Sequence, residues 1–321
     1  MVVGGPTITL SNGVNMPQVG LGTWQSSPAD VKTAVKAAIE AGYRLIDTAA
    51  IYQNEEAIGE AIKELIQAGK ITRDQLFITT KLWVTRLHPD DVEGALRESL
   101  GRLQMNYVDL YLIHAPTCFN HDMTAQNQSV KVEDTWRGME SVYKKGLAKA
   151  IGVSNFNGEQ IERVLKSSTV PIHNCQVELH LYWPQHELHE ICKKHNISVT
   201  SYASLGSPGR ANFNPKEKGR KVVWPEAPRD LDNANVKALA NKYSKTPAQI
   251  LLRYVMNRNI AVIPKSVNPS RIIENFQVFD FTLTDEDMRL LDESVKQHRR
   301  LFIIDFMAGH PEDPFASERK Q

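Results

Sequence analysis

The sequence is poor in cysteine, nearly neutral in charge and free of long apolar runs. Its 321 residues include three cysteines, Cys118, Cys175 and Cys192, an odd number without a short-range pairing pattern, which favours a reducing compartment. Lys and Arg total 38 against 37 Asp and Glu, so no basic excess points to nucleic acid or anionic lipid. No run approaches the ~20 apolar residues that span a bilayer. The N-terminal MVVGGPTITLSNG has no signal-peptide pattern, and we expect a cytoplasmic protein with neither nucleic-acid nor membrane partners.

Metal-ligand patterns are also scarce. The stretch C-K-K-H, Cys192 to His195, has the spacing of half a zinc site, but no second pair stands at ligand spacing. The histidines at 180, 186 and 189 do not fall at matching strand ends with carboxylates. We therefore expect ordinary helix residues in this region, no bound metal, and no metal-dependent hydrolase.

Short apolar, β-branched runs alternate with helix-patterned segments along nearly the whole chain. The pattern predicts eight strand-plus-helix units, with strands in 19–22, 44–48, 76–82, 108–114, 148–154, 174–179, 198–203 and 261–266. Repeated units of this kind imply right-handed crossovers and a parallel sheet. Eight of them favour an α/β fold of the (β/α)₈ TIM barrel type, with its active site at the carboxyl ends of the strands.

The helices predicted between these strands lie in 31–42, 55–69, 90–103, 132–146, 158–168, 187–195, 235–245, 247–259 and 270–279. Before the first unit, 7–10 and 14–19 flank Asn12-Gly13, a hairpin turn signal. The alternative is an open, doubly wound sheet that binds a dinucleotide through G-x-G-x-x-G in its first turn. Here that turn reads G-L-G-T-W-Q, and Gln25 replaces the third glycine. We therefore predict one barrel domain, 1–321, preceded by a β-hairpin.

Two segments exceed ordinary loop length, and a third has no clear period. Segments 118–131 and 204–230 are long enough to be lids or binding loops, and the basic, proline-rich part of the second (PKEKGRKVVWPEAPR, 215–229) is typical of a mobile flap. The tail after Gln297 contains the apolar stretch LFIIDF, whose side chains are expected to be buried against other parts of the protein. We expect this tail to pack over the barrel mouth.

Polar residues end three consecutive predicted strands. Asp47, Lys81 and His114 stand at these ends, and Tyr52 follows Asp47 in the same turn. A phenol titrates near pH ~10, but a lysine within ~4–6 Å would lower that pKa. An aspartate beside the lysine would keep the amine charged, and the histidine could donate a hydrogen bond to a substrate oxygen. Together they could protonate an oxygen that gains charge as hydride reaches its carbon.

Each of these residues also has an explanation without catalysis. Tyr52 could be a packing residue, Asp47 could cap a turn, and His114 could be a core histidine. Lys81 could be a surface cation or the Schiff-base lysine of an aldolase. A cofactor-binding protein without catalysis is a further possibility, because a barrel alone implies no activity. Their joint position at consecutive strand ends favours a catalytic set.

At this level of detail the chain resembles the aldo-keto reductases over nearly its whole length. The resemblance lies in VGLGTWQS (19–26), GYRLIDTAAIYQNEEAIGEAI (42–62), LFITTKLW (76–83), YLIHAP (111–116), AIGVSNFN (150–157), QVELH (176–180), SYASLGSPG (201–209) and IPKSVNPSRIIENF (263–276). It implies a (β/α)₈ barrel that reduces a small aldehyde or ketone with NADPH, with family precedent for a monomer. The family's catalytic residues correspond to Asp47, Tyr52, Lys81 and His114.

The segment IPKSVNPSR also has the chemistry of an anion site. Asn268 is a plausible N-cap and Pro269 suits the first helical position, so the helix N-terminus would lie beside Lys265, Ser266 and Arg271. A capped surface helix would look similar. The resemblance assigns Lys265, Ser266 and Arg271 to the adenosine 2′-phosphate, which favours NADPH over NADH.

The resemblance also implies the remaining cofactor and substrate contacts. Asp47 borders the cofactor, and the further cofactor residues are Gly22, Thr23, Ser154, Asn155, Gln176, Tyr202, Leu205, Ser207, Val267, Glu274 and Asn275. Trp24 and Trp83 correspond to aromatic pocket walls, so they would contact substrate together with Tyr52 and His114. Ala115 stands where well-known relatives carry a large aromatic, which would leave space for bulkier carbonyls. The family thus predicts the reaction better than the substrate.

Overall fold

Eight parallel strands form a closed barrel in this computed structural model, which describes residues 3–210 and 226–320. The strands are β3 (Gly20–Gly22), β4 (Leu45–Asp47), β5 (Phe77–Leu82), β6 (Leu110–Ile113), β7 (Ile151–Ser154), β8 (Asn174–Glu178), β9 (Ser198–Tyr202) and β10 (Ala261–Val262). Each pairs in parallel with the next along the chain. Bridges from Val19 to Val262 and from Gly22 to Lys265 join the first strand to the last. The predicted (β/α)₈ architecture is confirmed.

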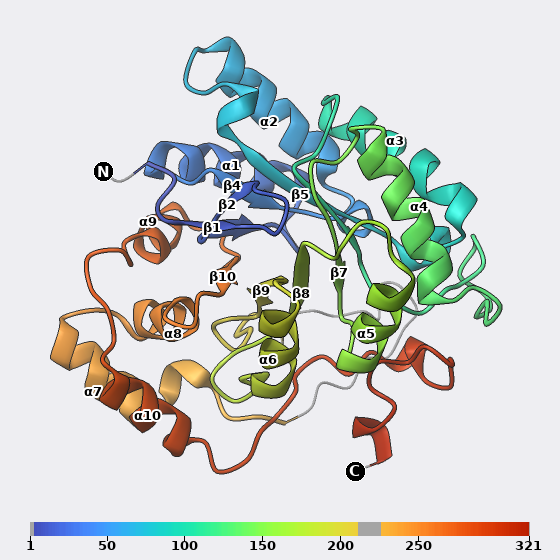
Figure 1. The fold of residues 1–321 in the computed structure, drawn as a ribbon. Coiled ribbons are helices and arrows are strands. Elements are labelled where there is room, and N and C mark those ends of the chain that lie inside the picture. Colours follow the sequence, from blue (N-terminus) through green and yellow to red (C-terminus); the bar gives the residue numbers. More distant parts are fainter. Residues whose placement is uncertain (1–2, 211–225, 321) are drawn as a thin grey trace.

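Helices surround the strands on the outside (Figure 1). They are α1 (Pro28–Ala41), α2 (Glu55–Gln67), α3 (Val92–Leu103), α4 (Val132–Lys144), α5 (Gly158–Ser167), α6 (His186–Lys194), α7 (Ala234–Tyr243), α8 (Pro247–Met256), α9 (Pro269–Phe276) and α10 (Asp285–Ser294). Local sequence sets several starts: Ser27 caps α1 with Pro28 in its first turn, and Thr246 and Gln249 form a capping box on α8. Because α9 packs against α1, the helix ring closes as the strands do.

The predicted N-terminal hairpin is present and closes one end of the barrel. β1 (Thr7–Thr9) pairs antiparallel with β2 (Asn15–Pro17), and Gly13 in the turn has a φ of 85°. Ile8, Leu10 and Met16 are buried in one cluster with the first residues of several barrel strands, among them Leu45 and Phe77. The hairpin therefore plugs the amino end of the strands, and the carboxyl end is left for the site.

The sequence patterns missed one helix. α10 lies between the last predicted helix and the tail, and it begins with a capping box in which Thr284 and Asp287 bond to each other's backbone N–H. This T-x-x-D arrangement is a readable start signal. The helix is only partly apolar, and among its residues Asp287 and Leu291 are buried, so its periodicity was weak.

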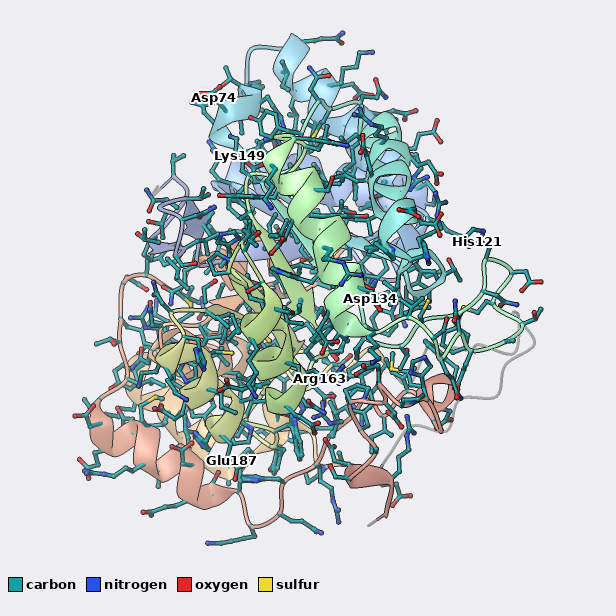
Figure 2. All side chains as sticks on the ribbon, turned by 45° about the vertical axis from the view of Figure 1, so that its right-hand side comes forward. Asp74, His121, Asp134, Lys149, Arg163 and Glu187 are labelled. Carbon is teal, nitrogen blue, oxygen red and sulfur yellow. The ribbon has the colours of Figure 1, made fainter. Side chains whose placement is uncertain are left out.

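The C-terminal tail crosses the barrel mouth, as predicted. Figure 1 shows the red segment after α10 running past α6 and α5. Farther along, Glu312 pairs with Arg163 of α5 at 2.7 Å, and Figure 2 shows Arg163 on the helix face beside the tail. Gln126 in the long 118–131 loop donates to the carbonyls of Phe306 and Ala308. Residues 211–225 of the expected flap lie outside the described residues.

Two further observations concern features that the sequence does not predict, a membrane-spanning helix and a metal site. None of the helices in the described part of the chain is long and apolar enough to cross a membrane. Within the same residues, no group of three or more His, Cys, Asp or Glu side chains is arranged to hold a metal ion. Cys192, the start of the C-K-K-H stretch, is a buried residue of α6 and carries a free thiol.

Candidate active site

The barrel brings the four predicted catalytic residues to one end. Asp47 is the last residue of β4, Lys81 lies near the end of the adjacent β5, and His114 directly follows the next strand, β6. Tyr52 ends a short 3₁₀ turn, Ala50–Tyr52, between β4 and α2. Neighbouring parallel strands end at the same edge of the barrel, so residues about 30 positions apart in the sequence meet there.

The Lys81 ammonium is buried and held by oxygen atoms. Its Nζ donates to Asp47 Oδ1 at 2.5 Å and to the Thr48 carbonyl at 2.9 Å, and its side chain is 1% exposed. Asp47 Oδ2 accepts a 2.7 Å hydrogen bond from Gln176 Nε2 of β8. Burial lowers the pKa of Lys81, and the nearby Asp47 carboxylate opposes that change. The aspartate therefore fixes the lysine and favours its charged form.

Tyr52 differs from the expectation in the direction of its pKa. The Lys81 Nζ lies 5.1 Å from the centre of the Tyr52 ring, as the proposed pairing requires. Burial nevertheless raises the pKa of Tyr52 well above its usual value, and the Asp47 carboxylate adds to the rise. The predicted acidification of Tyr52 is therefore wrong, because burial strongly disfavours the charged phenolate. Tyr52 is thus a protonated phenol at neutral pH.

His114 is a neutral imidazole next to the Tyr52 ring. The two ring centres are 5.7 Å apart, and Trp83 packs edge-on against His114 at 5.2 Å. Burial, with a smaller effect of the Lys81 cation, holds the pKa of His114 well below its usual value. Its Nδ1 is buried without a hydrogen-bond partner among the described residues. Buried polar atoms are normally paired, so this ring has hydrogen-bonding capacity for a ligand.

The residues expected around a nicotinamide lie together on the next strands. Ser154 ends β7, Gln176 lies in β8 and Tyr202 ends β9. Asn155, with a φ of 58°, joins them: its Nδ2 donates to the His114 carbonyl at 2.8 Å, and its Oδ1 accepts from the Tyr202 hydroxyl at 2.7 Å. These contacts link the polar groups into one network beside the four catalytic candidates.

A second polar region lies at the N-terminus of α9. Asn268 caps the helix by accepting from the Arg271 N–H at 3.2 Å, as predicted. Lys265 and Arg271 are exposed, and neither forms an ion pair with a described residue. Lys265 Nζ has a long 3.4 Å contact with the Gln25 carbonyl, and Ser266 is buried beside it. Two exposed cations beside a helix N-terminus fit a phosphate group.

The other expected cofactor residues are spread along the rim between these two regions. Thr23 Oγ1 donates to the Asp47 carbonyl at 2.9 Å. Leu205 and Ser207 flank Gly206 in the turn after β9. Glu274 accepts a hydrogen bond from the Thr246 hydroxyl, which ties its side chain to the start of α8. The remaining members are Gly22 at the end of β3, half-buried Val267 and buried Asn275 in α9.

Two tail residues that sequence reasoning did not name pack against the aromatic side chains expected to contact substrate. Trp24 packs against Phe302 at 5.8 Å, and Trp83 packs against Phe306 at 6.1 Å. The only signal for them was the apolar LFIIDF run in the tail. The space expected beside Ala115 is not open, because Ala115 is 1% exposed and clusters with residues that include Met307 of the tail.

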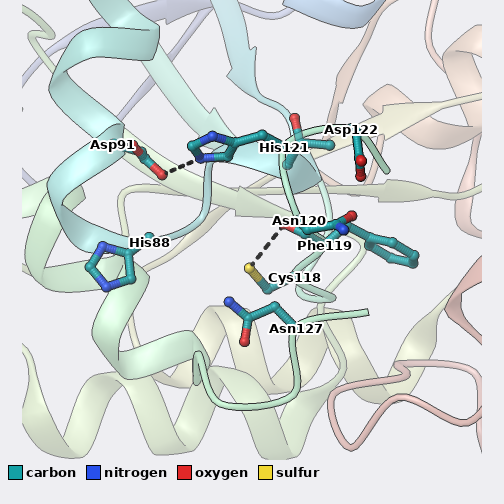
Figure 3. A pocket seen from close by; sticks show the side chains of 9 residues that line it. His88, Asp91, Cys118, Phe119, Asn120, His121, Asp122 and Asn127 are labelled. Atoms are coloured by element: carbon teal, nitrogen blue, oxygen red, sulfur yellow. Dashed lines mark hydrogen bonds and ion pairs between the residues drawn. The ribbon is translucent and has the colours of Figure 1, made fainter. Parts of the chain in front are cut away.

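Two cavities lie away from the four catalytic candidates. One encloses about 480 Å³ beside the 118–131 loop, where His121 Nε2 is 2.9 Å from Asp91 Oδ2 (Figure 3). The other encloses about 540 Å³ between α5, α6 and the tail and reaches Asn155. Neither is lined by Asp47, Tyr52, Lys81 or His114.

Comparisons with known proteins agree with this geometry. Residues 16–296 match the model of the Aldo/keto reductase family. The chain is 46% identical to aldo-keto reductase family 1 member A1-A of Danio rerio, covering 96% of this chain and 98% of that protein, and 46% identical to member A1 of Bos taurus, covering 96% and 97%. Among solved structures it is similar to the aldose reductase of Schistosoma japonicum, with a TM-score of 0.86, 39% identity, and 98% and 100% coverage. A Bombyx mori aldo-keto reductase in complex with NADP gives a TM-score of 0.87, 39% identity, and 98% and 99% coverage.

Proposed function

Because the chain belongs to the aldo/keto reductase family, we propose that it reduces an aldehyde or ketone to the alcohol with NADPH, using Tyr52 as the proton donor. The observation that carries this proposal is the buried Lys81–Asp47 ion pair beneath the Tyr52 ring, with neutral His114 at its side. A site that only bound a cofactor would gain nothing from a desolvated ammonium beside a phenol.

The cofactor assignment rests on the α9 region and on a relative. The Bombyx mori enzyme was solved with NADP, and the same group suits the two exposed cations beside the N-terminus of α9. Lys265, Ser266 and Arg271 would hold the 2′-phosphate, while Asn155 and Gln176 would hold the carboxamide. When bound, NADPH supplies the hydride that adds to the carbonyl carbon.

The protein's own part in the reaction is to supply and stabilise a proton. The Tyr52 hydroxyl donates its proton to the carbonyl oxygen as that oxygen gains charge, and the proton is later replaced from solvent. Lys81 favours the phenolate that is left, and Asp47 keeps the ammonium in place. The His114 N–H donates a hydrogen bond to the same oxygen. An aldolase mechanism would need Lys81 as a free amine, and its Nζ is already paired.

The substrate is proposed from the shape and polarity of the mouth. Trp24, Trp83, Phe302 and Phe306 line it with aromatic surface, while Tyr52 and His114 supply the polar end. This arrangement suits a small molecule with an apolar body and one carbonyl group. The monomeric state and the cytoplasmic location remain predictions from the sequence.

Replacing the proton donor tests the function. In Tyr52→Phe we expect kcat to fall at least about 100-fold, because general acid catalysis contributes 10²–10⁴-fold, with the Kd for NADPH changed by less than about threefold. The assay follows the loss of NADPH absorbance with a nitrobenzaldehyde. Tyr107→Phe is the matched control, since Tyr107 packs under Arg73 and Lys149 and is not part of the site. Normal turnover by Tyr52→Phe would refute the proton-donor role, and no turnover by the wild type with any carbonyl would refute the function.

A further inference from the structure

A buried charge cluster at the carboxyl end of β8 has no part in the proposed chemistry. Glu178, His180 and Asp230 are each at most 1% exposed. His180 Nε2 lies 3.0 Å from Glu178 Oε1, and its Nδ1 lies 3.2 Å from Asp230 Oδ2. A carboxylate faces each ring nitrogen, so both nitrogens donate and the ring is an imidazolium. Burial opposes this charge, but the two carboxylates outweigh it and raise the pKa of His180 to about 9.

Glu178 holds the start of the C-terminal tail. Its Oε1 accepts the backbone N–H of Leu301 at 2.5 Å, and its Oε2 accepts that of Phe302 at 3.0 Å. The Arg300 guanidinium lies 3.9 Å from Oε2 and pairs with Glu318 at 2.6 Å. One buried carboxylate therefore fixes two successive backbone N–H groups in a stretch of the tail that belongs to none of the described helices or strands.

Asp230 ends the long segment that follows β9 and binds residues that stand just after β8. Its Oδ2 also accepts the Leu181 N–H at 3.1 Å. The turn at Gly206 lies close to the same carboxylate, because a Cβ placed on Gly206 would be 2.1 Å from Asp230 Oδ1. Gly206 stands between Leu205 and Ser207, the two expected cofactor contacts. The imidazolium thus connects three segments that are distant in the sequence.

The cluster has a direct consequence for the barrel mouth. The Phe302 ring packs edge-on against both Trp24 and Tyr202, with ring centres 5.8 Å apart in each case. The position of this ring depends on its backbone, which is bonded to Glu178. Phe302 therefore borders the mouth, and the buried Glu178 carboxylate fixes the position of its backbone.

We propose that Glu178, His180 and Asp230 form a positioning cluster that fixes Phe302 as a wall of the substrate mouth, and that this cluster sets selectivity between bulky aromatic and small aliphatic carbonyls. The inference rests on the proposed function. Small aldehydes reach Tyr52 without contacting this wall, whereas a ring-bearing substrate packs against it. Loosening the wall therefore weakens binding of the larger substrate while the chemistry stays intact.

Glu178→Gln is the main test, because it keeps the side chain's shape and removes its charge. We expect the ratio of kcat/KM for a nitrobenzaldehyde to that for propionaldehyde to fall about tenfold, mainly through KM for the aromatic substrate. Glu312→Gln is the matched control: it removes another tail carboxylate, which accepts hydrogen bonds from Arg163 and Gln160 of α5 and does not contact the mouth. Its ratio is expected to stay within about twofold of the wild type.

Failure of this proposal can be distinguished from failure of the proposed function. Wild-type turnover of either aldehyde supports the function, and the ratio alone tests the cluster. In a Phe302→Ala background, Glu178→Gln is expected to have no further effect on the ratio, as for two residues that act through one wall. An unchanged ratio in Glu178→Gln, an equal change in Glu312→Gln, or a full additive effect in the Phe302→Ala background would overturn the proposal. If Glu178→Gln does not fold, Asp230→Asn decides the matter by the same ratio.

Discussion

At the residue scale, burial and neighbouring charges decide the protonation state of each catalytic candidate. Lys81 is charged because Asp47 is beside it, His114 is neutral because it is buried near that cation, and Tyr52 keeps its proton because burial disfavours the phenolate. These three states are the ones that a proton donor, its supporting cation and a hydrogen-bond donor need. The types of residue were readable from the sequence, whereas the direction of the Tyr52 shift was not.

The first prediction at this scale concerns Arg271. Arg271→Ala is expected to raise the Kd for NADPH about 10- to 100-fold, because a charged hydrogen bond contributes about 1.5–3 kcal/mol, and to change the Kd for NADH less than about threefold. Fluorescence titration with both nucleotides measures the two constants. Arg289→Ala, which removes an exposed cation of α10, is the control. Equal weakening of both nucleotides would contradict the 2′-phosphate assignment.

At the element scale, the barrel closes through very short strands. β3 has three residues and β10 has two, so the seam depends on close backbone approach. A Cβ placed on Gly22 would lie 2.5 Å from the Ile263 carbonyl oxygen. Only glycine allows this contact, so packing alone requires a glycine at the end of β3. This requirement is separate from the expected place of Gly22 near the cofactor.

Gly22→Ala is therefore expected to destabilise the fold by about 1–3 kcal/mol, the usual cost of forcing extra atoms into a packed region. Urea unfolding followed by circular dichroism measures the change. Gly101→Ala is the matched control, because Gly101 lies in α3 with nothing within 4 Å of an added Cβ. That variant should gain up to about 1 kcal/mol from helix propensity. Equal stabilities of the two variants would refute the seam argument.

At the scale of the whole molecule, a few long-range contacts join the ends of the chain to the barrel. α9 packs on α1, the tail is bonded to Glu178 of β8, and Glu312 is bonded to α5. These contacts favour one cooperative unit, although the single-domain assignment of 1–321 remains a prediction. His180 is the charged centre of the contact between the tail and β8. Glu178 and Asp230 face its ring, and Arg300 lies beyond Glu178.

The stability of the whole chain should therefore depend on the protonation of His180. Its folded pKa of about 9 is raised above the ordinary 6.5, so its contribution is complete below about pH 6.5 and is lost as pH rises through about 9. We expect the gap in unfolding free energy between wild type and His180→Gln to shrink by up to about 3 kcal/mol between pH ~6.5 and ~9.5. Urea unfolding at both pH values measures the gap. A gap that does not change with pH would show that the ring is not an imidazolium.

The sequence by itself determined the features that short-range patterns encode. Apolar periodicity predicted the eight units, and because parallel strands end on one edge, Asp47, Lys81 and His114 could be placed together before the structure was known. Asn268 was readable as a cap because capping acts within three residues. α10 carried a similar signal in Thr284 and Asp287, and its weak apolar face hid it.

Only the tertiary structure decided what depends on residues far apart in the chain. His180 and Asp230 are 50 positions apart, and Glu178 and Phe302 are 124 apart, so no local pattern joins them. The filled space at Ala115 and the raised pKa of Tyr52 depend in the same way on what surrounds each side chain. Burial and charge pairing are properties of the packed fold, and they become fixed when distant segments meet.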